Sequence, residues 1–85
     1  MYFVYVLKSE KDGRYYIGQT DNITKRLIQH KSGDVDSTKH RRPFRLIGYK
    51  SYANRNEARW VEYNLKHHSD KKKKFIQEIE SKFKK

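Results

Sequence analysis

The stretch Tyr2-Phe3-Val4-Tyr5-Val6-Leu7 is a continuous run of aromatic and aliphatic residues, several of them β-branched. Such a run predicts a strand that is buried on both faces. A second strand is expected over residues 14–18, and Asp12-Gly13 supplies a turn between the two, because glycine tolerates a positive φ. We therefore expect an antiparallel hairpin that carries Tyr5 and Tyr16 near its middle.

Three helices and one further strand are expected after this hairpin. Hydrophobic periodicity and capping residues place them, in chain order, as a helix at 22–32, a strand at 44–49, and helices at about 55–67 and 70–83. Residues 34–43 lack periodicity and are predicted to form a cationic loop. The order β-β-α-β-α-α predicts an α+β fold, in which helices flank a small three-stranded antiparallel sheet. Trp60 is expected to pack under the last helix, against Phe75 or Ile79.

Length and charge narrow the class of protein. The chain has 85 residues and is expected to form a single domain over 1–85. Its net charge of +11 indicates a polyanionic partner, which means nucleic acid or an anionic membrane surface. Aromatic residues make up 14% of the chain, which argues against a disordered basic tail.

Cysteine and hydropathy indicate the compartment. The chain has no cysteine, which excludes a disulfide scaffold and any cysteine-based metal site or nucleophile. A protein without disulfides suits a reducing compartment, and we expect a cytoplasmic location. The apolar run at 2–7 is too short for a signal peptide or a spanning helix, so no membrane association is expected.

Five side chains could serve catalysis rather than packing. Glu62 is expected beside the apolar face of its helix, where a carboxylate needs a partner or a metal; the alternative is a salt bridge with Arg26 or Arg59. Arg26 and His30 stand one helical turn apart and would present a guanidinium and an imidazole together. The alternative is a solvated arginine and an ordinary core histidine.

Two phenols complete this set. Tyr5 and Tyr16 lie on neighbouring predicted strands, and a buried phenol requires a hydrogen-bond partner. Both could equally be core tyrosines. Together with Arg26, His30 and Glu62 they suit phosphodiester cleavage, and we expect all five to line one cleft.

These residues resemble a known family. Phe3-Val4-Tyr5, ten intervening residues and then Tyr16-Ile17-Gly18 resemble the signature of the GIY-YIG nucleases, and Arg26, His30 and Glu62 follow in the family's order. The resemblance spans roughly residues 2–68. It is strongest to short single-domain bacterial members, which are related to the N-terminal nuclease domain of an excinuclease. Phe3 departs from the signature, which has glycine at that position.

The resemblance implies a metal-dependent endonuclease that hydrolyses DNA phosphodiester bonds with one divalent metal, in DNA repair or processing. It implies that Glu62 is the sole protein ligand of Mg²⁺ or Mn²⁺, and that Arg26 holds the scissile phosphate. Tyr5 or Tyr16 would orient or deprotonate the attacking water, and family members differ in which tyrosine does so. His30 would contact the phosphate or position the water.

Further basic residues are candidates for DNA contacts. The alternative for each is a solvated surface charge. They are Lys25, Arg41, Arg42, Lys71, Lys72, Lys73 and Lys74. The DNA could be double-stranded or branched, and a protein partner could supply specificity. Two other hypotheses remain open at this point: a catalytically idle nucleic-acid-binding module with the same fold, and a basic structural or ribosome-associated protein.

Overall fold

The apolar run near the N-terminus forms β1 (Tyr2–Ser9), the central strand of a three-stranded sheet in the computed structural model, which describes residues 1–83. β2 (Tyr15–Thr20) and β3 (Phe44–Tyr52) pair with it on either side, both antiparallel, in the order β2-β1-β3. Residues 4–7 are buried, as predicted for a strand covered on both faces. The expected α+β fold with a three-stranded antiparallel sheet is confirmed.

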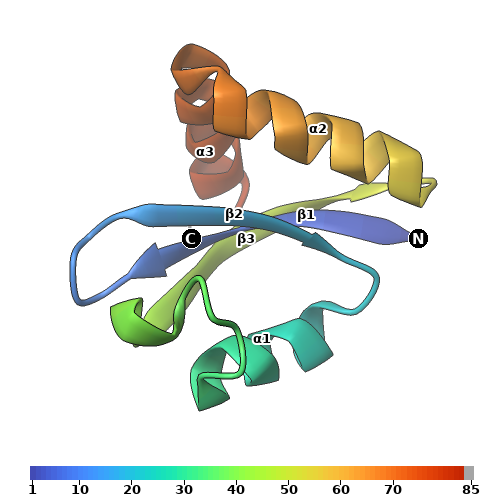
Figure 1. Cartoon of the computed structure of the whole chain (residues 1–85). Coiled ribbons are helices and arrows are strands. Elements are labelled where there is room, and N and C mark those ends of the chain that lie inside the picture. Colours follow the sequence, from blue (N-terminus) through green and yellow to red (C-terminus); the bar gives the residue numbers. More distant parts are fainter. Residues whose placement is uncertain (84–85) are drawn as a thin grey trace.

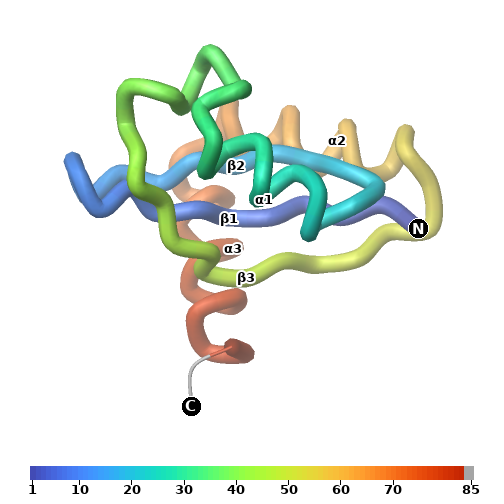
Figure 2. Tube along the Cα trace, turned by 90° about the horizontal axis from the view of Figure 1, so that it is seen from below, coloured from blue at the N-terminus to red at the C-terminus, as the bar shows by residue number. Residues whose placement is uncertain are grey.

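Helices cover both faces of this sheet (Figure 1). α1 (Ile23–Ser32) and a short 3-10 helix, η1 (Lys39–Arg41), lie on one face, while α2 (Arg55–His67) and α3 (Ser69–Phe83) lie on the other. Figure 2 views the sheet from the side of α1 and shows this helix in front of β2 and β1. The helix boundaries agree with the predicted ones to within one residue. Each strand ends two or three residues later than expected, and β2 also begins one residue later.

Side chains of β1 alternate between these two layers. Val4 and Val6 join the main core between the sheet and the helices α2 and α3. The other members of that core are Ile17, Ala58, Leu65, Phe75, Ile76 and Ile79. The same alternation sends the Tyr5 phenol to the opposite face, where it meets α1.

Local capping determines where α1 and α2 begin. The side chain of Asn22 accepts a hydrogen bond from the backbone N–H of Lys25 at 3.0 Å, and Asn54 accepts one from Glu57 at 2.9 Å. Each asparagine satisfies a backbone donor that the first turn leaves free. Gly33 ends α1 with a φ of 86°, a left-handed conformation that favours glycine.

The predicted burial of Trp60 under α3 is wrong. Trp60 is 66% exposed and stacks on Tyr63 at the surface of α2. α3 instead packs over β3 at Gly48, where a Cβ atom would collide with Ile79 and Phe83. Because Ala58 already turns the other side of α2 towards this core, Trp60 faces away from it.

Within residues 1–83, no helix is both long enough and apolar enough to cross a lipid bilayer.

Candidate active site

A buried hydrogen-bond chain joins β1, α1 and the loop before η1. The Tyr5 hydroxyl lies 2.8 Å from Nε2 of His30, and Nδ1 of His30 lies 2.8 Å from Oγ1 of Thr38. None of the three residues is more than 1% exposed. The Thr38 hydroxyl donates to the carbonyl of Val35, so it accepts from Nδ1–H, and Nε2 accepts from the Tyr5 hydroxyl. His30 thus holds the Tyr5 phenol in one orientation.

The protonation of this chain follows from its burial. Desolvation raises the pKa of Tyr5 to about 12, with nearby Arg26 acting in the opposite direction. Desolvation, followed by the charge of Arg26, lowers the pKa of His30 to about 4. At neutral pH the phenol therefore keeps its proton and the imidazole is neutral.

Tyr16 lies beside these groups but is less buried. Its ring centroid is 6.4 Å from that of Tyr5 and 5.2 Å from that of His30. The ammonium of Lys66, which comes from α2, lies 5.3 Å from the centre of the Tyr16 ring. Tyr16 therefore stands between the buried chain and α2.

Gly18 makes room for the two phenols. It is the partner of Tyr5 in the pairing of β1 with β2. A Cβ atom at this position would lie 2.5 Å from the Tyr5 hydroxyl oxygen and 3.1 Å from Cε2 of Tyr16. Any larger residue would displace the Tyr5 phenol, so the close approach of the phenols depends on glycine at this position.

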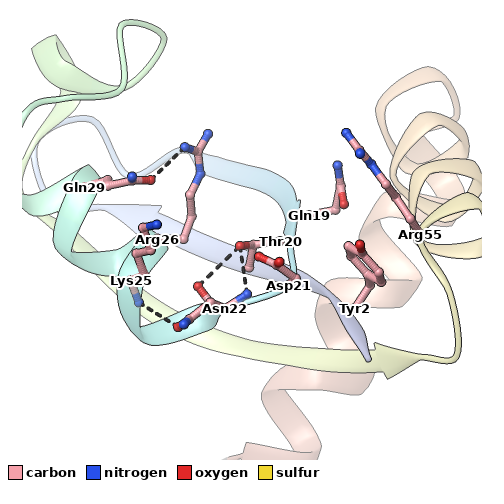
Figure 3. A pocket seen from close by; sticks show the side chains of 9 residues that line it. All are labelled: Tyr2, Gln19, Thr20, Asp21, Asn22, Lys25, Arg26, Gln29 and Arg55. Carbon is pink, nitrogen blue, oxygen red and sulfur yellow. Dashed lines mark hydrogen bonds between the residues drawn. The ribbon is translucent and has the colours of Figure 1, made fainter.

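Arg26 borders a polar hollow of about 340 Å³ at the end of β2 (Figure 3). The phenol of Tyr5 and, to a smaller extent, that of Tyr16 raise the pKa of its guanidinium. Nη1 of Arg26 donates to Oε1 of Gln29 at 3.0 Å. Across the hollow from Arg26 stand Gln19 and Arg55, as Figure 3 shows.

The lining of this hollow is suited to an anion. Lys25 contributes a third cation, and Asp21 is the single acidic residue among those that line it. Two guanidinium groups facing one space offer paired N–H donors to the oxygens of a phosphate. The hollow is therefore a candidate phosphate site.

Glu62 lies on α2, the helix that covers the opposite face of the sheet from α1. Its carboxylate pairs with Lys66 one turn along the helix, at 3.1 Å, and its side chain is 22% exposed. The partner is thus Lys66 rather than Arg26 or Arg59. The same Lys66 ammonium lies over Tyr16, so Glu62 and Tyr16 share a cation at the β2 edge.

The five predicted side chains gather around β2. Arg26 lines the 340 Å³ hollow, whereas His30 borders a second one of about 760 Å³ beside η1. Tyr5 is buried between the sheet and α1, and Glu62 approaches from α2. That all five line one cleft stays a prediction.

Glu62 is the carboxylate that the resemblance implies as the metal ligand. No three His, Asp or Glu side chains cluster as a metal site anywhere in residues 1–83. The Glu62 carboxylate, whose side chain is 22% exposed, is a hard oxygen donor. That donor set fits Mg²⁺ or Mn²⁺, because such hard cations keep several waters and take further oxygens from a substrate phosphate.

The predicted DNA-contacting residues have different surroundings. Lys25 lines the candidate phosphate site. Arg41 is paired with Asp12 at 3.0 Å, and Arg42 donates to two backbone carbonyls at 2.9 and 3.3 Å, so both hold η1 in place. The lysines at 71–74 lie in the first turns of α3, on the far side of the sheet from α1. Their contacts with DNA stay a prediction.

Two kinds of candidate residue were not predicted from the sequence. The positions 55, 59, 62 and 66 repeat at helical spacing, so Arg55 and Lys66 could have been placed beside Glu62 from the sequence alone. Thr38 carries no such signal, because it lies in a segment without periodicity and meets His30 only through the fold.

Comparisons with known proteins agree with the fold. The family model described as the GIY-YIG catalytic domain matches residues 1–75. The UPF0213 protein BH0048 of Halalkalibacterium halodurans is 38% identical over 73 residues, which cover 85% of this chain and 77% of the relative. UPF0213 protein YazA of Bacillus subtilis is 39% identical over 79 residues, covering 91% and 79%.

A solved structure supports the same assignment. The solution NMR structure of the UPF0213 protein BH0048 from Bacillus halodurans matches with a TM-score of 0.57 and 34% identity, covering 93% of this chain and 85% of that one. The resemblance found in the sequence is thereby confirmed. The chain belongs to the GIY-YIG family.

Proposed function

We propose that this protein is a metal-dependent endonuclease that hydrolyses DNA phosphodiester bonds with one divalent metal. One observation carries the proposal. Arg26, the phenols of Tyr5 and Tyr16, and the Glu62–Lys66 pair come from four separate elements of the fold and lie close together. Family membership and the net charge of +11 support it.

Arg26 is the proposed ligand of the scissile phosphate. Its guanidinium stands beside the two phenols and opens onto the candidate phosphate site, where Arg55 and Lys25 add positive charge. Donors fixed in this way stabilise the negative charge that grows on the phosphoryl oxygens as the bond to water forms. Gln29 holds Arg26 in this position through its side-chain oxygen.

Tyr16 is the proposed base, and Tyr5 the positioning residue. The Tyr5 hydroxyl is buried, donates to His30 and has a pKa of about 12, so it is a poor proton acceptor. Tyr16 is less buried, the Lys66 ammonium lies over its ring, and the Arg26 guanidinium lies near its phenol. The deprotonated Tyr16 oxygen would take a proton from the attacking water as the new P–O bond forms, and the oxygen of the leaving strand would take a proton from solvent as its bond to phosphorus breaks.

Glu62 is the proposed ligand of the metal. When bound there, Mg²⁺ or Mn²⁺ supplies Lewis-acid stabilisation of the phosphate charge. The Glu62–Lys66 pair is an i,i+4 pair near the surface, and such pairs contribute only about 0.3–0.5 kcal/mol. Lys66 can therefore release Glu62 at little cost and turn towards DNA.

The proposed substrate is DNA, bound mainly through its backbone. We infer a cytoplasmic role in DNA repair or processing, with a partner protein supplying any target specificity. In the alternative, an idle nucleic-acid-binding module, Glu62 would remain paired with Lys66 and DNA would be bound but not cut.

Nicking of supercoiled plasmid tests the proposal and the roles of the two tyrosines. Wild-type protein should nick with Mg²⁺ or Mn²⁺ and not in EDTA. Tyr16→Phe should slow nicking by about 10²–10⁴-fold, the usual contribution of a general base. Tyr5→Phe should slow it less and should lower stability by about 1 kcal/mol, because His30 loses a hydrogen-bond donor.

Two outcomes would contradict the proposal in different ways. DNA binding without nicking in either metal would favour the idle module. Nicking that survives Tyr16→Phe but is abolished in a folded Tyr5→Phe variant would reverse the roles assigned to the two tyrosines.

A further inference from the structure

An exposed ladder of aromatic rings runs along α2, on the side away from the core. Trp60 is 66% exposed and Tyr63 is 56% exposed. Their rings are nearly parallel, with planes 14° apart and centroids separated by 6.4 Å. The His67 ring lies 4.1 Å from that of Tyr63, at 44°. Trp60, the only tryptophan of the chain, is the ring of this ladder nearest the start of α2.

The ladder is ordered before anything binds to it. Tyr63 contacts Trp60 on one side and His67 on the other, and all three side chains project from consecutive turns of one helix. Rings that are already in place lose little rotamer freedom when a further ring stacks on them. A large, solvated tryptophan is also unusual, since tryptophan is highly buried on average.

A row of cations adjoins the ladder. Arg55, Arg59 and Lys66 fall along one side of α2, next to the side that carries Trp60 and Tyr63. Arg59 is exposed, and the side chain of Lys66 is 46% exposed. Arg55 lines the candidate phosphate site together with Arg26. The row therefore leads from the ladder to that site.

We propose that this ladder stacks an unpaired base of a DNA strand whose phosphates lie along Arg55, Arg59 and Lys66. Aromatic rings beside a positively charged track are the two elements with which proteins hold single strands without regard to sequence. Base pairs in a duplex present no free ring face, so the ladder selects DNA with a single-stranded segment. This deepens the proposed function, because it names a substrate class for the same site and rests on that function in doing so.

The charge of the surface supports this occupant over a second copy of the chain. Each copy carries a net charge of +11, so self-association through α2 would bring two cationic rows together. A phosphodiester strand instead brings one negative charge per nucleotide to that row.

Trp60 provides a direct test by fluorescence, since every change in tryptophan emission comes from this residue. Wild-type protein is titrated in EDTA with an oligothymidylate of about 12 nucleotides, within the usual site size of about 4–16. A blunt-ended duplex without a loop is titrated in parallel and compared at equal phosphate concentration. The single strand should quench Trp60 strongly and saturably, and the duplex should quench it weakly.

Variants are compared by the anisotropy of a labelled oligothymidylate. Trp60→Ala should weaken binding by about 5- to 150-fold, the effect of losing one base–aromatic stack, and Trp60→Phe should restore part of the affinity. Ile28→Ala is the matched control, because Ile28 is a similarly exposed apolar residue on α1, at 62%. It should bind like the wild type.

Three results would overturn the inference. These are Trp60→Ala binding as tightly as the wild type, equal quenching by the single strand and the duplex, or Trp60 emission that changes with protein concentration alone. The last result would assign the ladder to a second copy. Because hydrolysis needs the metal and these titrations exclude it, a failure of the nuclease proposal would leave their outcome interpretable.

Discussion

Lowering the pH should destabilise the protein through His30, whose pKa is lowered to about 4 by burial first and by Arg26 second. In the unfolded chain this imidazole takes up a proton near its ordinary pKa of about 6.5. Between about pH 6.5 and 4 the unfolded state therefore binds more protons than the folded state. The free energy of unfolding contributed by neutral His30 is fully present above pH 6.5 and is lost progressively as the pH falls.

The size of the loss follows from the difference between the two pKa values. The ordinary pKa is 6.5 and the folded pKa is about 4, a difference of about 2.5 units, and each unit corresponds to about 1.36 kcal/mol. The loss over the whole interval is therefore about 3 kcal/mol. For a protein with a total stability of about 5–15 kcal/mol this is a large fraction.

His30→Gln is the comparison that isolates this effect. The amide can donate to Thr38 and accept from Tyr5, as the imidazole does, but it does not titrate. Urea denaturation followed by circular dichroism at pH 7 and pH 4.5 should show the wild type losing about 2–3 kcal/mol more than the variant. Any effect of the lower pH on the carboxylates occurs in both proteins and cancels. Parallel pH profiles would refute the buried, neutral state of His30.

Two other predictions concern packing and charge. Gly18→Ala should cost about 1–3 kcal/mol and slow any nicking, because the new Cβ displaces the Tyr5 phenol from His30; an unchanged thermal midpoint and rate would show that Tyr5 has room to move. With about six to ten phosphate contacts, duplex affinity should fall about 10³–10⁵-fold between about 50 and 200 mM salt. Binding that is insensitive to salt would contradict backbone recognition.

The elements of the fold were predictable because local chemistry determines them. The apolar run of β1, the caps Asn22 and Asn54 and the stop at Gly33 are properties of short segments, and the strand and helices that they define lie close to the predicted positions. The pairing of Tyr5 with His30 was predictable only in part, since helical spacing shows which face His30 shares but not which strand it meets.

The position of Trp60 was not predictable from periodicity. Both sides of α2 carry apolar or aromatic residues, with Ala58 and Leu65 on one side and Trp60 and Tyr63 on the other. Periodicity identifies two such sides but does not show which one α3 will cover. In the structure the side with Ala58 and Leu65 faces the core. Contacts between distant segments, such as that of Lys66 with Tyr16, could not be predicted either, because they also depend on the tertiary packing.

The measurement that tests the proposed nuclease mechanism most directly is the metal-dependent nicking rate of Glu62→Gln. The amide keeps the shape of the side chain but lacks the charge that holds Mg²⁺. Glu57→Gln is the control, because Glu57 is an exposed glutamate on the first turn of the same helix. We predict that Glu62→Gln abolishes nicking, that its DNA affinity stays equal or rises, and that its thermal midpoint is unchanged, while Glu57→Gln nicks normally. Nicking by Glu62→Gln at the wild-type rate would remove Glu62 from the mechanism and contradict a metal-dependent reaction at this residue.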